Sequence, residues 1–468
     1  MRARHYACIG LTLVLAVLAT GEARGEEKPP PNVLIVVLDA CRADRLTPYG
    51  FDRDTTPTLD RLAKDPDVVL FRRHYVQAPW TKPSTASLFT GLPVSQHKVY
   101  RGHTREKERK AQKTFVTDRL PEERTTLAER MKSAGLSTFG VVWGRQLEPE
   151  YGFAQGFDQY FTHDVKTDQN RLAKLLELID EVEQPFFGYV HFEGCHLPFP
   201  KNQRHKKYMK EHSIPYDEAS RKSEGVDVGK GDLVFAVNMD GLDLRDEDAA
   251  FLDLTYQAKT RRMDEEIVAP LLAGLTERGL DDDLLLLVTA DHGEELYEHG
   301  TYGHSQGLWD EIVHVPLLVR FPKGTKPDTL SKEVDVPTQA IGIAPSLVAA
   351  VGLPPDDSLP GANLLAGETP PHAVTEMSPI WGSRGFAIIE GGHKLLHLNG
   401  GNLLTDLVTD PGEKVNLASK DPARAAKMSA KALALKRYYH EMQKSAPLVD
   451  VKLDPAAIEQ LRALGYME

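Results

Sequence analysis

Three continuous apolar runs constrain the fold of this 468-residue chain more than any other feature of its sequence. They lie at residues 33–38 (VLIVVL), 186–192 (FFGYVHF) and 284–289 (LLLLVT). Runs of this length and composition are typical of strands that are buried on both faces of a sheet. The intervening sequence has helical spacing, and we expect helices at 125–134 and 254–275. This alternation predicts an α/β fold, with a large mixed, mostly parallel sheet and helices on both of its faces.

The end of the chain differs in composition from the part that contains these runs. Turn residues cluster at 352–355 (GLPP), and short strand-like pieces follow at 386–389 and 394–397, before a helix from about 422 to 444. We therefore expect a C-terminal subdomain, residues 356–468, that holds a small antiparallel sheet and a helix.

The main domain, residues 32–355, contains one stretch without clear periodicity. Residues from about 201 to 248 are polar, charged and interrupted by glycine, which predicts a surface insertion. Whether this insertion is a lid or a mobile segment stays open. Its lysines, at 201–210, are few and offset by acids, and the chain has a formal net charge of -12 without a basic stripe. We therefore expect no nucleic-acid partner.

The first 25 residues have the pattern of a secretory signal peptide. Arg2 and Arg4 precede an apolar run at 8–19, and small residues lead to an A-x-G cleavage site at 23–25. The run is shorter than the roughly 20 residues that span a bilayer, so we expect no stable membrane anchor. A Pro-rich linker, 26–31, follows, and the mature chain is expected to be secreted or periplasmic.

Cleavage at this site would leave two cysteines, Cys41 and Cys195. A pair of cysteines in an oxidising compartment can form one bridge, and two free thiols buried as small apolar side chains are the alternative. The sequence leaves this choice open, together with the oligomeric state.

Polar residues with chemical potential follow each of the three apolar runs. Asp39 follows the first run, and Asp291 and His292 follow the third. The second run contains His191 and leads to Glu193 and His196. The carboxyl ends of parallel strands form the edge at which open α/β sheets bind ligands. Asp39 taken alone fits a turn residue, and Asp291 a helix cap. An adjacent carboxylate and imidazole also suit a divalent cation such as zinc or manganese.

The segment at 78–91 (APWTKPSTASLFTG) predicts a turn that leads into a helix. Thr81 would lie near the helix N-terminus, with Pro83 in the first turn. Thr81 is either a helix cap or a nucleophile at this position. The positive end of a helix favours an alkoxide and an anionic substrate, and a nearby cation would lower the pKa of the hydroxyl further.

Taken in order along the chain, these segments resemble the sulfatase family of the alkaline phosphatase superfamily. The matching segments are 37–50 (VLDACRADRLTPYG), 55–60 (TTPTLD), 78–91, 126–130 (TLAER), 134–135 (AG), 196–199 (HLPF), 289–294 (TADHGE), 309–311 (WDE), 315–317 (VPL), Leu407, 410–413 (DPGE), 416–417 (NL) and 461–466 (LRALGY). They cover nearly the whole mature chain, and the resemblance implies the alkaline-phosphatase-like fold.

The resemblance also implies a set of site residues. The metal ligands would be Asp39, Thr81, Asp291 and His292, and they would hold a zinc, manganese or calcium ion, with one ion or two in the site. Thr81 would be the nucleophile. His196 would lie beside the substrate anion or protonate the leaving group, and His304 would take the place of the family's cationic contact to the anion.

Four further residues are expected to contact the substrate: Lys82, Arg145, Glu193 and His299. Arg145 is the one remnant of a cationic segment that contacts sulfate in the family. Glu193 and His299 would either complete a second metal site or line the pocket, and His299 also fits a structural surface histidine.

The chain departs from the family at positions that bear on its chemistry. Sulfatases have Cys or Ser in a C/S-x-P-S-R motif, which is oxidised to formylglycine, whereas this chain has TKPST at 81–85. Thr81 cannot become formylglycine, the motif's Arg is absent, and Ala40 replaces the family's second Asp. A Thr nucleophile resembles the relatives that act on phosphodiesters, phosphonates and phosphoethanolamine.

We therefore expect hydrolysis of phosphate or phosphonate esters rather than of sulfate esters. The substrate would be an anionic ester in a small molecule, a glycan or a lipid headgroup. The alternatives are a sulfatase that works without formylglycine and an inactive module that binds an anionic ligand. The retention of the four metal-site residues weighs against the inactive module.

The signal sequence gives the first testable prediction. The mature protein should begin near Glu26 and be recovered from the periplasm or the medium. N-terminal sequencing of the purified protein checks this, and an intact Met1 found in membrane fractions would contradict it.

Overall fold

A computed structural model gives the fold of the chain and describes residues 29–100, 116–162, 164–199, 203–211, 233–377, 385–398, 401–441 and 450–452. The expected signal peptide, the start of the expected linker and the motif at 461–466 lie outside these ranges. No helix within the described ranges has both the length and the apolar character needed to cross a bilayer.

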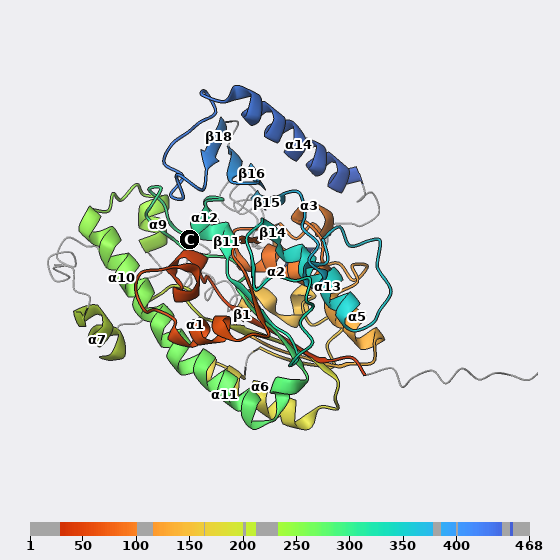
Figure 1. The fold of residues 1–468 in the computed structure, drawn as a ribbon. Coiled ribbons are helices and arrows are strands. Elements are labelled where there is room, and N and C mark those ends of the chain that lie inside the picture. The colour runs from red at the N-terminus through yellow and green to blue at the C-terminus, as the bar shows by residue number, and fades with distance from the viewer. Residues whose placement is uncertain are drawn as a thin grey trace, which may run out of the picture.

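The main sheet has eight strands in the order β13-β2-β12-β8-β1-β7-β5-β6 (Figure 1). In chain order they are β1 (Asn32–Leu38), β2 (Val68–Phe71), β5 (Ser137–Val142), β6 (Gln159–Phe161), β7 (Phe186–Phe192), β8 (Leu284–Thr289), β12 (Leu317–Arg320) and β13 (Glu333–Val334). β12 runs antiparallel to its neighbours β8 and β2, and the other neighbouring strands of this sheet pair in parallel. The three apolar runs form β1, β7 and β8 at the centre, so the predicted mixed, mostly parallel sheet is confirmed.

Helices cover both faces of this sheet (Figure 1). Successive side chains of a strand point to opposite faces, so Leu34, Val36 and Leu38 of β1 lie in one apolar core and Val33, Ile35 and Val37 in the other. The first core contains side chains of α1 (Pro57–Lys64), α6 (Asp168–Glu181), α10 (Asp246–Met263) and α11 (Ala269–Glu277). The second contains side chains of α2 (Thr81–Thr90), α5 (Leu127–Ser133) and α13 (Ile343–Ala350).

The expected helix at 254–275 differs from the structure in two ways. It begins earlier, at Asp246, because three acids in the first turn interact favourably with the positive end of the helix. It is also interrupted between α10 and α11 by a π-helical turn, Asp264–Val268. Pro270, in the first turn of α11, lacks an N–H and clashes with the carbonyl four residues earlier in a regular helix, and the wider turn relieves both conflicts.

The expected insertion is partly helical where the structure describes it. It contains α7 (Gln203–Glu211) and α9 (Leu233–Asn238), whereas residues 212–232 lie outside the described ranges. Leu233, Val234 and Val237 of α9 are buried in the first core. A helix of six residues is too short for its spacing to be recognised, which is why the sequence suggested an irregular segment.

Shorter elements complete this part of the molecule. Two strand pairs are β9 (Glu295–Leu296) with β10 (Tyr302–Gly303), and β4 (Val116–Asp118) with β19 (Asp450–Lys452). A three-stranded sheet contains β11 (His314–Val315), β3 (His74–Tyr75) and β14 (Thr338–Gln339). The short helices α3 (Val94–His97) and α12 (Asp310–Val313) lie between strands.

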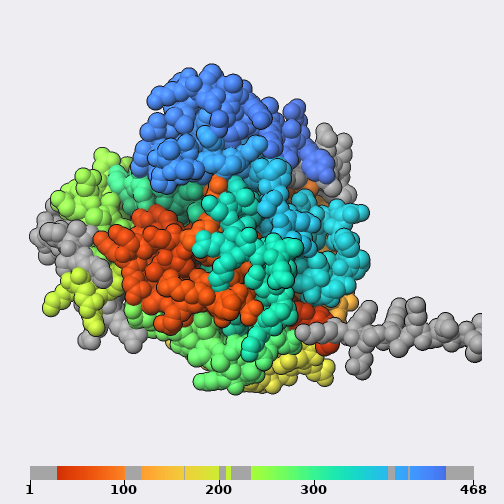
Figure 2. Space-filling model, in the orientation of Figure 1, coloured from red at the N-terminus to blue at the C-terminus, as the bar shows by residue number. Residues whose placement is uncertain are grey.

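The C-terminal sheet has four antiparallel strands: β15 (Ala373–Met377), β16 (Gly385–Glu390), β17 (His393–Leu398) and β18 (Gly401–Asp406). Helix α14 (Pro422–Glu441) packs on it through Ala425, Met428 and Ala432. Together they form one lobe, coloured blue in Figure 2. The predicted small antiparallel sheet and helix are confirmed, with β15 and β18 added to the two strand-like pieces that the sequence suggested.

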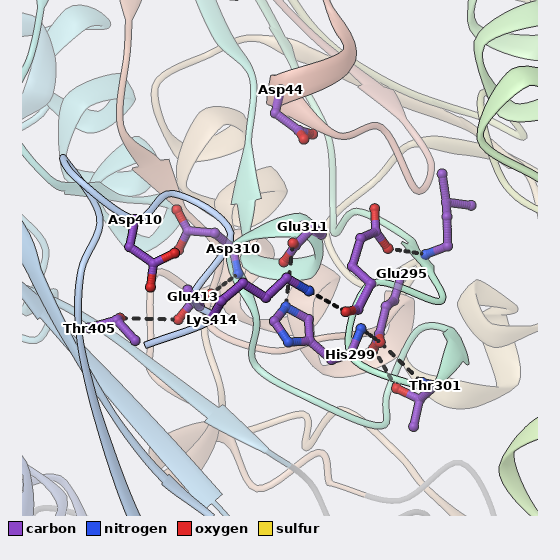
Figure 3. Close-up of polar contacts among 12 residues, drawn as sticks. Asp44, Glu295, His299, Thr301, Asp310, Glu311, Thr405, Asp410, Glu413 and Lys414 are labelled. Carbon is purple, nitrogen blue, oxygen red and sulfur yellow. Dashed lines mark hydrogen bonds and ion pairs between the residues drawn. The ribbon is translucent and has the colours of Figure 1, made fainter. Parts of the chain in front are cut away.

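An ion cluster with two buried members, Lys394 and Glu413, ties this lobe to the rest of the molecule. The amine of Lys394, on β17, lies 2.9 Å from Glu413 Oε2 and 3.0 Å from Asp310 Oδ1, at the start of α12. Glu413 Oε2 also accepts a hydrogen bond of 2.7 Å from the backbone N–H of Asp310 (Figure 3). Lys394 and Glu413 are buried, so each charge depends on the others for its stabilisation.

We expect Lys394→Met to lower the free energy of unfolding by about 3 kcal/mol, because it leaves two carboxylates without their cation in a buried site. Denaturant unfolding measures this change. Lys431→Met is the matched control, since Lys431 forms a 3.1 Å pair with Glu390 in which both side chains are about one-third exposed. That control should cost less than about 1 kcal/mol. Equal losses in the two variants would contradict the role given to the buried cluster.

Candidate active site

The site lies at the carboxyl edge of the main sheet, where the three central strands end. β1 pairs with β7 on one side and with β8 on the other, and Val37 lies opposite both His191 and Thr289. The chain therefore leaves all three strands at the same level. The residues that follow β1 and β8 meet there, at the edge where open α/β sheets bind their ligands.

Asp39, Asp291 and His292 form a compact group of candidate metal ligands. Their ligand atoms all lie within 4.8 Å of one another. His292 Nε2 lies 3.4 Å from Asp39 Oδ1 and 3.5 Å from Asp291 Oδ2, and all three side chains are buried. Within the described ranges, these are the His, Cys, Asp or Glu side chains that lie close enough, in a group of three or more, to hold one metal ion. Neither Glu193 nor His299 belongs to this group.

The chemistry of this group fits a divalent cation. Asp39 Oδ1 and Asp291 Oδ2 are buried and have no hydrogen-bond partner among the described residues. Burial, and then the neighbouring carboxylate of Asp291, raises the pKa of Asp39 well above its usual value. His292 Nδ1 lies 2.8 Å from the carbonyl of Gly293, which directs the Nε2 lone pair toward the two carboxylates. A cation among these atoms would satisfy both orphaned oxygens and offset the repulsion between the carboxylates.

Thr81 is the first residue of α2, and its side chain is buried. Its hydroxyl oxygen lies 3.2 Å from His292 Nε2, beside the candidate metal ligands. The capping position belongs to Trp80, and no side chain caps this helix terminus with a hydrogen bond. The structure therefore places the Thr81 hydroxyl in the site, at the helix N-terminus that the sequence predicted.

Three histidine rings lie together on this side of the sheet. The ring centroid of His304 is 4.3 Å from that of His292 and 4.9 Å from that of His196. Burial, followed by the charges of His304 and His292, lowers the pKa of His196 well below its usual value, so this ring is neutral. His304 has a carboxylate partner instead, since its Nδ1 lies 2.7 Å from Glu294 Oε1.

Glu294 joins the elements that carry His196 and His304. Its carboxylate is buried, and while Oε1 contacts His304, Oε2 accepts a hydrogen bond of 3.4 Å from the backbone N–H of Leu197. The sequence motif contained Glu294, but its partners His304 and Leu197 lie 10 and 97 residues away along the chain, and no local pattern identified this connection.

The Lys82 side chain contacts residues that do not belong to the metal-ligand group. Its amine donates a hydrogen bond of 2.6 Å to the Thr117 hydroxyl and lies 3.8 Å from the centre of the Tyr151 ring. Burial lowers the pKa of Lys82 to about 7. These contacts direct the side chain toward β4 and the turn that contains Tyr151.

Arg145 and Glu193 also have structural partners. Arg145 lies in a short 3-10 helix, Arg145–Leu147, with its Nε 3.9 Å from Glu148 Oε1. Glu193 forms a 2.8 Å ion pair with Lys259, whose amine also donates to the carbonyl oxygen of His196. Lys259 thus supports the loop that carries His196, and the sequence had given no sign of it, because Lys259 lies on α10, 63 residues further along the chain.

The structure places His299 beside Glu311 (Figure 3), and His299 does not belong to the metal-ligand group. Its ring stacks on Trp309 with the centroids 3.8 Å apart and the planes 9° from parallel, and its Nε2 lies 3.5 Å from Glu311 Oε1. The role of His299 toward a substrate stays a prediction. Cys41 and Cys195 are both buried free thiols in this structure, which is the second of the two arrangements that the sequence left open.

His191 lies in the site, although the sequence alone suggested no function for it. It is buried, and its Nε2 lies 3.1 Å from Asp39 Oδ2 and 3.7 Å from Asp291 Oδ2. A histidine within an apolar strand was the signal that pointed to it.

Comparisons with known proteins identify the family of this chain. A sequence model of the family described as Sulfatase matches residues 31–353. The chain is 22% identical over 394 residues to the uncharacterized sulfatase YidJ of Escherichia coli strain K12, which covers 74% of this chain and 73% of YidJ. It is 22% identical over 329 residues to the phosphoethanolamine transferase EptC of Escherichia coli O18:K1:H7, covering 65% of this chain and 48% of EptC.

Among solved structures, the phosphonate monoester hydrolase of Agrobacterium radiobacter superposes with a TM-score of 0.67 at 23% identity. The match covers 87% of this chain and 96% of the other, and it shows that the two proteins share a fold. The family match extends over well more than half of the 468 residues and includes Asp39, Thr81, Asp291 and His292. The chain therefore belongs to the sulfatase family and is a hydrolase that acts on ester bonds.

Proposed function

We propose that this protein is an exported, metal-dependent hydrolase that cleaves phosphate or phosphonate esters through a covalent intermediate on Thr81. One observation carries the proposal. The Thr81 hydroxyl lies at the N-terminus of α2, 3.2 Å from His292 Nε2, where a nucleophile and a cation would meet.

The residue type at position 81 favours phosphorus over sulfur. Formylglycine is an aldehyde, and oxidation of a threonine side chain gives a ketone, because its Cβ carries a methyl group. Thr85 also stands where the family's formylglycine motif has Arg. The similarity to proteins named as a phosphoethanolamine transferase and a phosphonate monoester hydrolase supports the same choice.

Asp39, Asp291 and His292 would hold the cation, and zinc, manganese or calcium would suit their oxygen and nitrogen atoms. When bound, the cation would lower the pKa of the Thr81 hydroxyl, so that its proton passes to water. Thr81 Oγ then attacks the phosphorus, an O–P bond forms, and the bond from phosphorus to the leaving oxygen breaks. That oxygen takes up a proton. A water molecule then attacks phosphorus, the Thr81 Oγ–P bond breaks, and the hydroxyl is restored.

His304 would contact the substrate anion, and His196 would take part in proton transfer. His304, backed by the carboxylate of Glu294, is suited to face the negative charge of the substrate. His196 is a neutral ring whose Nδ1 contacts the carbonyl of Leu197, so its Nε2 is suited to accept a proton from the attacking water. The ring would then release this proton to solvent and be neutral again before the next turnover.

The second candidate function is sulfate ester hydrolysis without formylglycine. The family itself favours it, since the matching model is that of the sulfatases and the relative YidJ is named a sulfatase. In either case we propose an anionic ester as the substrate, carried by a small molecule, a glycan or a lipid headgroup. Parallel assays of the metal-loaded enzyme on phosphomonoester, phosphodiester, phosphonate and sulfate esters of nitrophenol distinguish the two functions.

The metal site gives a prediction that does not depend on the substrate. Asp291→Asn and His292→Ala should each reduce the affinity for zinc or manganese by about 10-fold or more, because each removes one of only a few ligands. Metal analysis after dialysis against a weak chelator measures this loss. His299→Asn should keep the wild-type metal content, since its ring lies on Trp309 outside the group. Full occupancy in the first two variants would remove those residues from the metal site.

Substitutions of Thr81 test the covalent mechanism. Thr81→Ala should lower turnover by about three powers of ten or more, as loss of a nucleophile usually does. The fold and most of the metal binding should survive. Thr81→Ser should keep partial activity, because the attacking oxygen remains. Mass spectrometry of a quenched reaction should find the transferred phosphoryl or phosphonyl group on residue 81.

A matched control lies in the same helix. Thr90 is a buried threonine at the other end of α2, and its hydroxyl donates to the carbonyl of Ala86. Thr90→Ala should therefore turn over like the wild type. If Thr81→Ala also did so, direct attack by water would replace the covalent mechanism.

A further inference from the structure

We propose that His191 is a positioning residue of the metal site, which holds Asp39 so that one carboxylate oxygen is left to face the cation. The inference rests on the proposed metal site. It gives a role to a side chain outside the set that was carried over from the family.

The two carboxylate oxygens of Asp39 have different surroundings. Oδ2 lies 3.1 Å from His191 Nε2. Oδ1 lies 3.4 Å from His292 Nε2 and has no hydrogen-bond partner among the described residues. Both residues are buried, so bulk water does not compete for these atoms. The imidazole of His191 therefore occupies one oxygen and leaves the other to a ligand.

The hydrogen bonds of His191 fix its proton. With a cation bound, Asp39 would be ionised and would only accept hydrogen bonds, so His191 Nε2 would carry the proton that it donates to Asp39. The other ring nitrogen, Nδ1, lies 2.9 Å from the hydroxyl of Tyr189. In the neutral ring this nitrogen accepts, and the Tyr189 hydroxyl donates. The result is a buried relay from Tyr189 through His191 to Asp39, of the kind that orients metal-binding side chains in proteins.

The strand geometry explains how this relay is built. Tyr189 and His191 are two residues apart on β7, so their side chains lie on the same face of the sheet, the face that α2 covers. The backbone of Asp39 is held by the same segment, through its N–H to the carbonyl of Phe192 at 3.2 Å and its carbonyl to the N–H of Cys195 at 2.9 Å. β7 thus positions both the main chain and the side chain of Asp39.

The sequence departure at position 40 makes this support more important. Members of the family have a second Asp here, whereas this chain has Ala40. The carboxylates of the candidate metal group are therefore those of Asp39 and Asp291 alone. A site with fewer anionic ligands depends more strongly on the orientation of each one, since a rotated Asp39 would turn Oδ1 away from His292.

The alternative is that His191 itself binds the cation. Its Nε2 lies 3.7 Å from Asp291 Oδ2, so the ring is near enough to the group for this to need a test. A direct ligand and a positioning residue differ in what a hydrogen-bonding replacement restores. A glutamine amide can donate to Asp39 and accept from Tyr189 without matching the strength of imidazole as a zinc or cobalt ligand.

The experiment measures the dissociation constant for Zn²⁺ of the full chain by competition with a chromogenic chelator, without substrate. His191→Leu should weaken binding by about 10- to 100-fold, as loss of an outer support of a metal ligand usually does. His191→Gln should recover most of this loss, and Tyr189→Phe should weaken binding by a smaller factor. His74→Leu is the matched control, because His74 is a buried strand histidine whose Nδ1 lies 3.0 Å from the Thr338 hydroxyl and which does not belong to the metal-ligand group. It should lower stability and leave the Zn²⁺ affinity unchanged.

Visible spectra of the Co²⁺-substituted proteins separate the two roles of His191. A positioning role predicts that His191→Gln keeps the wild-type ligand-field bands. If Leu and Gln variants lost affinity equally and both changed these bands, His191 would be a direct ligand and the proposal would be wrong. Wild-type affinity in a folded His191→Leu or His191→Gln variant would also overturn it. If the wild-type protein bound no divalent cation, the metal site of the proposed function would itself be refuted.

Discussion

The site depends on the pairing of β1 with β7 on one side and with β8 on the other. This parallel register brings Val37 opposite His191 and Thr289, so that Asp39, His191 and Asp291 reach the same edge of the sheet. A slip of one residue in either pairing would turn every side chain of the strand to the opposite face. The apolar cores on the two faces prevent such a slip, because each requires its own alternate set of β1 side chains. Chemistry and core packing are therefore fixed by the same hydrogen bonds.

Much of this fold could be predicted because its signals are local. The central strands appear as unbroken apolar runs, and Asp39, Asp291 and His292 follow them directly in the sequence. The start of α2 at Thr81 is equally local, since a turn and a proline mark it. The relay from Tyr189 to Asp39 could not be predicted in this way. His191 and Asp39 are 152 residues apart, and only the sheet register shows that they touch. The direction of the Lys82 side chain, which depends on Thr117 and Tyr151, was hidden for the same reason.

The electrostatics of the site show why its residues act as a set. Three carboxylates, those of Asp39, Asp291 and Glu294, are fully or almost fully buried at one edge of the sheet. Each is unfavourable there unless a positive charge or a donor compensates it. Glu294 has His304 and the backbone of Leu197, and Asp39 has His191 for one of its oxygens. In the part of the chain that the structure describes, Asp39 Oδ1 and Asp291 Oδ2 have no hydrogen-bond partner, and they lie 3.4 and 3.5 Å from His292 Nε2. The arrangement of donors thus leaves uncompensated negative charge where the proposed cation and nucleophile would lie.

The buried cluster of Lys394, Glu413 and Asp310 has a consequence for where the chain can be cut. The family match ends at residue 353, which invites expression of the preceding part as an independent fragment. Such a fragment would retain Asp310 and lose Lys394. The backbone carbonyl of Gln77 would also lose the hydrogen bond that it accepts from the N–H of Glu376. The C-terminal lobe alone would keep a buried Lys394 and Glu413 but lack the third charge. We therefore expect truncation at this boundary to damage both pieces, because each would lose partners that the other supplies.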